Sequence, residues 1–452
     1  MSATEPLINA GPGGVMEAGI APARHPESVP FWFDGENVAF RNLGVEKAIG
    51  TDHILTVGKK VIRIAQAFVP GSGTRAYYQC DDFSIFGWNG AGFPYFIGQT
   101  ASKADLIPYG SWLFVASNGL WCWKNSGAMN QVSGVGTDVD FGLRFKRHLL
   151  LSGNGTAVHW PDVRDPTNFT VGRGSTAGKL QLRDMGSNAL CARPCGDGVA
   201  LYSTDAMRVI KYAGAGVWFG EAGEPVNGIG AISDRSVVEA GFKNYGLNRN
   251  GFFITDGVSF QYIDTPAFHG YLESRLDWAK QNQVFGWHNE KFQEIMWVYP
   301  GLDGVQHGVA FKYTNGSFTR YKLPIYAAEP RDVFPFPLIG TVGGLAYANG
   351  TANASCFVRT KPLDAGNALR YKYFDNFRLV GKFRNGTTTM RLGLHDTLNG
   401  APTWVYEGPA QSSTFLMREA VFLTVEFTTE EEPSFEISQI LVTGNIAGDI
   451  FQ

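Results

Sequence analysis

Short runs of apolar side chains, separated by glycine-containing corners, dominate the middle of the chain. The run from Phe292 to Tyr299 has large apolar or aromatic side chains at both even and odd positions. Because successive side chains of a strand point to opposite faces, a half-exposed strand would alternate apolar and polar residues. This run therefore predicts a strand covered on both faces, with Glu294 on the face that it shares with Met296 and Val298.

The segments on either side of this run extend it into a meander. A short strand and a turn at His288-Asn289 precede the run, and the corner Thr314-Asn315-Gly316 follows the next strand. Asn and Gly tolerate the positive φ of tight hairpin turns, so this corner is typical of a hairpin. Residues 281 to 323 thus predict four antiparallel strands in roughly 40 residues, the size of one propeller blade.

Similar strand-like runs recur along the chain at uneven spacings of roughly 30 to 60 residues, within the range of propeller units. The composition fits an all-β protein, with 13% aromatic residues, 56 Gly, 22 Pro and only 17% charged residues. We therefore expect an all-β fold with a β-propeller of about six blades. A sandwich and a solenoid are the alternatives that the pattern leaves open.

The two ends of the chain differ from this middle. Residues 1–30 are rich in Gly, Ala and Pro without periodicity, which indicates either an extended arm or a disordered terminus. Near the other end Met390, Leu392 and Leu394 alternate with more polar residues, the pattern of an antiparallel sandwich. With a boundary near Asp364, the prediction is an arm at 1–30, a propeller at 31–364 and a sandwich-like domain at 365–452.

Charge and cysteine content limit the possible functions. A net charge of −3 argues against a protein that binds nucleic acid tightly through counterion release. No N-terminal signal and no run of 18 apolar residues is found, so neither export nor a membrane span is predicted. The odd number of cysteines favours reduced thiols, and the Asn-X-Ser/Thr sites are interpreted as turns. These residues are Cys80, Cys122, Cys191, Cys195 and Cys356, and Asn168, Asn315 and Asn353.

Two groups of residues were considered as candidate sites. Cys191 and Cys195 lie four residues apart, but no second Cys or His pair follows at zinc-site spacing, so two thiols are the better interpretation. Four aspartates could pair as glycosidase carboxylates, because propellers often host that chemistry, yet their local sequences are typical of turns. These are Asp162, Asp165, Asp256 and Asp264. The segment around Asn154 resembles a sialidase Asp-box but has Asn where the Asp belongs. We expect no catalytic residue, no cofactor and no metal site.

Four segments, taken together, resemble the tail hub or nozzle family of short-tailed bacteriophages. They are WFDGENVAFRNLGVEKAIG at 32–50, AVHWPDVRDPTNFTVG at 157–172, FGWHNEKFQEIMWVYP at 285–300 and REAVFLTVEFTTEEEPSFEISQILVTGNIAG at 418–448. Two positions depart from the family pattern: Phe169 replaces a more usual Trp, and Met296 replaces a second aromatic residue.

This resemblance implies a structural role without catalysis. It implies a homohexameric ring below the portal and adaptor rings, contact with a tail fibre, spike or needle protein, and a channel for loose, non-specific passage of double-stranded DNA. The protein would be assembled in the host cytoplasm and located in the virion tail. The rival hypothesis is a propeller glycosidase or carbohydrate-binding protein, which requires converging acidic and aromatic residues at the propeller mouth. A third possibility is a different virion part of the same architecture, such as a fibre-attachment or stopper protein.

Glu294 is predicted to be a structural acceptor, because an ionised carboxylate buried without partners would cost several kcal/mol. We expect its hydrogen-bond donors to come from an Arg, a Trp or backbone N–H groups of an adjoining strand or loop.

Overall fold

The computed structural model describes most of the chain. It covers residues 8–10, 31–41, 44–48, 50–136, 139–153, 157–214, 218–263, 266–350, 355–366, 370–383, 388–429 and 435–449. Nearly all regular structure in this part is β-strand, as predicted. The helical elements there are short: α1 (Pro266–Glu273), η3 (Trp278–Gln283) and η4 (Glu290–Phe292). None of the described helices is long and apolar enough to cross a membrane.

The described residues between 50 and 350 form seven antiparallel sheets, each built around four strands, which in six of the sheets pair as a meander. The first sheet contains β6 (Val61–Val69), β7 (Gly73–Cys80), β8 (Ser84–Trp88) and β9 (Tyr95–Gln99), and the second contains β10 (Asp105–Tyr109), β11 (Trp112–Ala116), β12 (Leu120–Trp123) and β13 (Asn130–Gln131). The third contains β14 (Phe141–Phe145), β15 (His148–Ser152), β16 (Ala157–Trp160) and β17 (Gly178–Gln181). The fourth contains β18 (Cys191–Cys195), β19 (Gly198–Tyr202), β20 (Ala206–Gly214) and β21 (Trp218–Glu221), with β22 (Val226–Asn227) beside β20.

The last three sheets complete the set. The fifth sheet contains β23 (Val237–Ala240), β24 (Lys243–Asn248), β25 (Gly251–Thr255) and β26 (Phe260–Tyr262), and the sixth contains β27 (Phe285–Asn289), β28 (Glu294–Pro300), β29 (Gln306–Lys312) and β30 (Ser317–Tyr321). The seventh contains β31 (Ala327–Glu329), β32 (Leu338–Gly340) and β33 (Gly344–Gly350), which pairs with β5 (Gly50–Thr56). The seventh sheet thus takes its outer strand from the start of this region.

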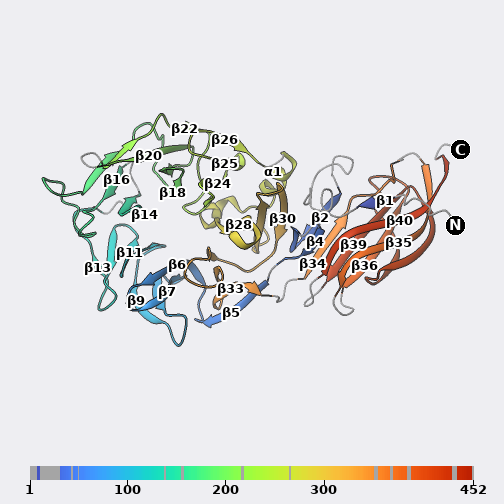
Figure 1. Cartoon of the computed structure of the whole chain (residues 1–452), viewed down its shortest axis with the longest axis horizontal. Helices are drawn as coiled ribbons and strands as arrows, with labels where there is room; N and C mark the ends of the chain where they lie inside the picture. Colours follow the sequence, from blue (N-terminus) through green and yellow to red (C-terminus); the bar gives the residue numbers. More distant parts are fainter. Residues whose placement is uncertain are drawn as a thin grey trace.

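The seven sheets are arranged in a ring. Their first strands contact one another in chain order, and β31 of the seventh sheet contacts β6 of the first. Figure 1 shows the sheets around a common centre, which is the arrangement of a β-propeller. The count is seven sheets rather than the expected six or so. The seventh sheet leaves little pattern in the sequence, because β31 and β32 have only three residues each and β5 precedes them by about 270 residues.

The strand predicted at Phe292 to Tyr299 is β28, and it is covered on both faces. It begins at Glu294, because Gln293 adopts a left-handed conformation with φ 58° after η4, so Phe292 lies outside the strand. Trp297 and its face pack against the preceding sheet, where the indole Nε1 donates to the Ser236 carbonyl at 3.0 Å. Met296 and its face pack against the following sheet. The two-sided burial and the predicted meander at 281–323 are confirmed.

The remaining strands form two packed sheets at the other end of the molecule. One contains β3 (Val38–Arg41), β4 (Gly44–Lys47), β40 (Phe435–Asp449), β35 (Arg370–Phe383) and β38 (Ser413–Ala420), with β1 (Ile8–Ala10) beside β40; the other contains β2 (Trp32–Glu36), β34 (Cys356–Thr360), β39 (Phe422–Thr429), β36 (Thr388–His395) and β37 (Thr403–Pro409). Buried side chains of both sheets make up one shared core. This part is therefore a sandwich.

The sandwich is built from both ends of the chain, which corrects the predicted boundaries. Residues 32–47 and 356–360 were assigned to the propeller at 31–364, but their strands pair inside the sandwich. Within the predicted arm at 1–30, the structure describes β1, whose Ile8 and Ala10 are buried in the sandwich core; the other arm residues lie outside the described part. The propeller spans residues 50–350, and the sandwich takes the segments on either side.

A polar junction joins the sandwich to β30, the outer strand of the sixth sheet. The buried Arg320 guanidinium pairs with Asp34 of β2 and donates to the Tyr271 hydroxyl at 2.8 Å. Asn37 donates its backbone N–H to the Arg320 carbonyl at 2.8 Å, and its side chain accepts from the Lys322 N–H at 2.8 Å. Figure 1 shows β2, β4 and β34 between the ring and the rest of the sandwich.

This architecture predicts how fragments behave. A fragment of residues 1–364 loses β35 to β40 and so exposes the apolar faces of β2, β3 and β34, whose Trp32 and Phe40 are buried in the whole chain. We expect it to aggregate or to be proteolysed at its ends, whereas residues 50–350 should give a folded propeller. Size-exclusion chromatography, circular dichroism and limited proteolysis test this. A monodisperse 1–364 fragment with both ends protease-resistant would contradict the shared sandwich core.

Candidate functional site

Charged side chains converge where the first strands of the sheets begin. They come from five of the seven sheets: Arg63, Lys103, Asp105, Arg193, Asp234, Arg235 and Glu329. We call this set the axial network. Four of its members are cations and three are acids, so the network carries an excess of positive charge.

Asp234 is the acceptor for two of these cations. The carboxylate pairs with Arg63 of the first sheet and with Lys103 before the second, whose Nζ lies 3.2 Å from Oδ1. Burial by itself raises the pKa of Asp234, but the neighbouring Arg63 and Lys103 cations outweigh this effect and hold the pKa below its ordinary value. Asp234 therefore stays ionised and joins the fifth sheet to sheets that are not its neighbours in the ring.

Arg235 makes a second set of contacts across the ring. Its guanidinium lies 3.2 Å from Asp105 of the second sheet and 3.9 Å from Glu329 of the seventh. Burial raises the pKa of Glu329 to about 7, even though the nearby Arg235 cation acts in the opposite direction. Glu329 thus changes its charge near neutral pH.

Arg193 is bound differently from the other cations. Its Nε donates to the Val237 carbonyl at 2.8 Å, and its terminal nitrogens donate to the carbonyls of Ala192 at 2.7 Å and Asp234 at 3.3 Å. Together with Arg235 and Glu329, Arg193 lines a cavity of about 290 Å³. Because these ion pairs join sheets on different sides of the ring, the side chains of the axial network cross the propeller axis.

The aspartates considered as glycosidase carboxylates lie in turns. Asp162 accepts from the Arg164 backbone N–H at 2.9 Å and binds its guanidinium, and these hydrogen bonds hold the pKa of Asp162 below its ordinary value. Asp165 accepts from the Thr167 N–H at 3.0 Å. In another sheet, Asp256 accepts from the N–H groups of the two residues that follow Gly257, at 2.9 and 2.8 Å. Asp264 lies outside the described residues.

These contacts satisfy the three carboxylates locally, and the structure does not bring Asp256 together with the Asp162–Asp165 turn to form a shared acidic site. Asn168 and Asn315 are also turn residues, as predicted, because each side chain accepts from a backbone N–H two residues later. Asn154 and Asn353 lie outside the described part of the chain.

The cysteine pair is buried in β18. Cys191 and Cys195 are free thiols there, and burial raises their pKa to about 12 and about 11. Thiols with raised pKa values are poor nucleophiles and poor metal ligands at neutral pH. Within the described residues, no cluster of three His, Cys, Asp or Glu side chains suited to a metal ion was found.

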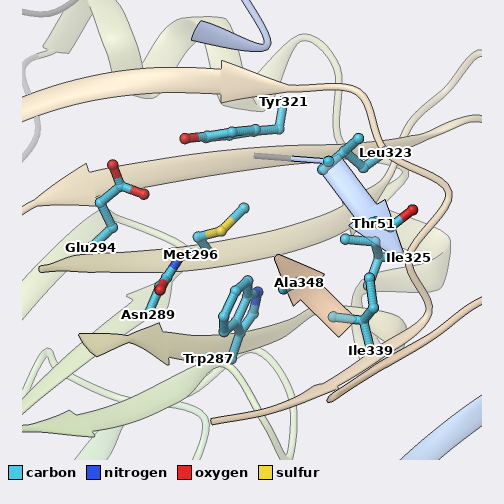
Figure 2. A pocket seen from close by; sticks show the side chains of 11 residues that line it. Thr51, Trp287, Asn289, Glu294, Met296, Tyr321, Leu323, Ile325, Ile339 and Ala348 are labelled. Atoms are coloured by element: carbon cyan, nitrogen blue, oxygen red, sulfur yellow. The ribbon is translucent and has the colours of Figure 1, made fainter. Parts of the chain in front are cut away.

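Glu294 is buried, as predicted, with 3% of its surface exposed. It lines a small cavity of about 20 Å³ with Trp287, Met296 and Tyr321, enough for about one water molecule. In Figure 2 the hydroxyl end of Tyr321 points toward the Glu294 carboxylate. The donors that we expected, an Arg, a Trp or backbone N–H groups, remain a prediction.

The axial network was missed by sequence reasoning. Its members carry no motif spacing, because they come from segments up to about 270 residues apart and meet only when the ring forms. The available signal was weak: a charged residue lies just before or inside the first apolar strand of several predicted units, as in Lys103, Asp105 and Arg235.

Comparison with known proteins gives likenesses of fold only. No protein-family model and no curated protein matches the chain. Similar solved structures include the computationally designed Ika8 protein (10% identity, 66% of this chain and 99% of that chain, TM-score 0.41), a chain of the mitotic checkpoint complex (11%, 66% and 90%, 0.45) and the Neurospora crassa Pan2 WD40 domain (9%, 64% and 88%, 0.39). TM-scores this low carry no argument, so the propeller assignment rests on strand pairing and burial.

Substituting Glu329 tests the electrostatics of the axis. Because folding raises its pKa from 4.5 to about 7, the folded protein binds the proton more tightly, and the free energy of unfolding falls as pH rises through this interval. Glu329→Gln has no titrating carboxyl at this position and so does not lose this stability as pH rises. The free energy of unfolding of the variant minus that of the wild type should therefore increase by roughly 1–2 kcal/mol from pH 4.5 to pH 8. Urea unfolding at both pH values measures it. An unchanged difference would contradict the raised pKa.

Substituting Glu294 tests its role as a buried acceptor. Glu294→Leu leaves its donors unsatisfied and should lower the free energy of unfolding by about 1–3 kcal/mol, while Glu294→Gln, which keeps one acceptor oxygen, should lower it less. Denaturant unfolding of both variants checks this order. The matched control is Glu224→Leu at a side chain that is 92% exposed, with an expected change within about 0.5 kcal/mol. Wild-type stability of Glu294→Leu would show that the carboxylate has no structural role.

Proposed function

We propose that this protein is a structural component of a bacteriophage tail, a nozzle or hub subunit that forms a ring below the portal and adaptor. In this role it retains packaged DNA and later forms the conduit for DNA ejection. The partners are other copies of the chain, the adaptor ring above, and a fibre, spike or needle protein below.

The observation that carries this proposal is the position of the family-like segments. The segment 32–50 supplies β2 to β4 of the sandwich, and 418–448 supplies β39 and β40, which pair with β34 and β4. The segment 285–300 supplies β27 and β28, in the same sheet as Arg320, which pairs with Asp34. The segments 32–50 and 418–448 therefore meet in the sandwich, and the segment 285–300 lies in the propeller sheet whose β30 packs on β2 and β3.

This junction suits a load-bearing ring subunit. The Arg320 side chain is buried and that of Asp34 is 28% exposed, and the hydrogen bonds of Asn37 join the backbone of the sandwich to β30. Buried pairs of this kind fix one relative orientation, because breaking them leaves an uncompensated charge. A protein that holds DNA under pressure needs such a fixed orientation between its domains.

The axial network defines where a conduit can lie. Side chains from sheets on different sides of the ring are in contact across the axis, so a DNA duplex does not fit through a single propeller. In the proposed assembly the channel is therefore enclosed between subunits. The net charge of −3 agrees with loose passage, because tight binding to phosphates requires clustered cations.

Electron microscopy of virions that contain this chain tests the proposal. We expect six copies in a ring between the adaptor and the tail tip, with the DNA channel between subunits. A monomer, or a three-fold spike at the tail end, would contradict it. The rival carbohydrate-active function is tested on the purified protein: polysaccharide hydrolysis that is lost in Asp162→Asn or Asp256→Asn would replace the tail role with an enzymatic one.

A further inference from the structure

A second pocket lies beside the axial network, at the end of the propeller where β6, β27 and β31 begin. It has a volume of about 330 Å³, within the range of small-molecule sites. Its wall combines three cations with three amide and three aromatic side chains: Lys60, Arg63 and Lys103; Asn282, Gln283 and Gln306; and Phe83, Phe285 and Tyr326. We call it the axial-mouth pocket.

The cations of this pocket outnumber the acids that they contact. Arg63 is only 3% exposed, and both Arg63 and Lys103 bind the single carboxylate of Asp234. Lys60 lies over the Tyr326 ring at 4.8 Å, and the acid that lines the pocket itself, Asp81, is exposed. Against Asp234 and Asp81, the three cations Lys60, Arg63 and Lys103 leave one positive charge in excess at the pocket.

The protonation of Lys103 reflects this imbalance. Burial and, after it, the Arg63 cation lower the pKa of Lys103 to about 8, in spite of the attraction of Asp234. An anion in the pocket would offset both effects and keep the ammonium group charged.

Gln306 has an unsatisfied hydrogen-bond acceptor beside the pocket. Its Oε1 is buried and has no hydrogen-bond partner in the part of the chain that the structure describes. A buried amide oxygen without a donor costs about 1–3 kcal/mol, so a rotation of the Gln306 amide that brings Oε1 to an O–H or N–H group of a ligand in the pocket would recover this cost.

We propose that the axial-mouth pocket binds a small hydroxylated organic anion, a sugar acid or a sugar phosphate. Its carboxylate or phosphate group would bind Lys103 and Lys60, and a hydroxyl would donate to Gln306. The carbon skeleton would pack against Phe83 and Phe285. This inference does not depend on the proposed tail role.

Isothermal titration of the full-length protein tests the ligand class. The probes are glucuronate, glucose 6-phosphate, inorganic phosphate and neutral glucose. We expect one or both hydroxylated anions to bind with millimolar or tighter affinity, phosphate to bind more weakly, and glucose not to bind. Preference between the first two probes distinguishes carboxylate from phosphate. Equal binding of glucose, or no binding of either anion at about 10 mM, would overturn the proposal.

Variants locate the site. Lys103→Met should weaken anion binding at least about tenfold, because a charge-assisted contact is lost. Gln306→Leu should weaken glucuronate or glucose 6-phosphate but leave inorganic phosphate unchanged. The matched control is Lys211→Met, whose ammonium pairs with Asp197 at 3.0 Å in the fourth sheet and lies outside the pocket.

Circular dichroism establishes that each variant is folded. If Lys103→Met does not fold, Lys60→Met, at another cation of the pocket wall, gives the same test. Wild-type affinity in whichever of these two variants is folded, or an equal loss of binding in the Lys211→Met control, would show that the anion does not bind at the axial-mouth pocket.

Discussion

Each sheet of the propeller has two apolar faces, and covering both is the constraint on which the rest of the structure depends. In β28 one face packs with the fifth sheet and the other with the seventh, so neither neighbour can be removed without exposing a core. The same requirement applies to every sheet and is satisfied only when the sheets follow one another around a ring. The pairing of β5 with β33 brings the first and last segments of this region into one sheet.

The ring geometry has an electrostatic consequence at its centre. First strands from all sides begin close to one axis, where the space between backbones is filled by long charged side chains rather than by apolar ones. Asp234 and Arg235 are adjacent in sequence but bind partners in different sheets. Such pairs contribute less to stability than to the selection of one arrangement, because any other register leaves a buried charge unpaired.

The junction between the two domains links the fold to the proposed role. The sandwich holds strands from both ends of the chain, and β30 of the propeller packs directly on β2 and β3. Arg320 therefore contacts a strand that precedes it by about 285 residues. The two domains are thus held against each other by packed strands and buried hydrogen bonds.

The sequence by itself determined the local features of this protein. The alternation of apolar and polar side chains identified half-exposed strands, and its absence identified the two-sided burial of β28 and the burial of Glu294. These features depend only on the side-chain period of a strand and on the cost of exposing apolar surface. The turn roles of Asp162 and Asn315 likewise follow from neighbouring residues. The tertiary structure alone decided the number of sheets, the place of residues 32–47 in the sandwich, and the axial network. Each of these features depends on pairing between segments that are far apart in the chain. The pairing of β5 with β33 and the ion pair of Arg63 with Asp234 leave no periodic signal along the sequence.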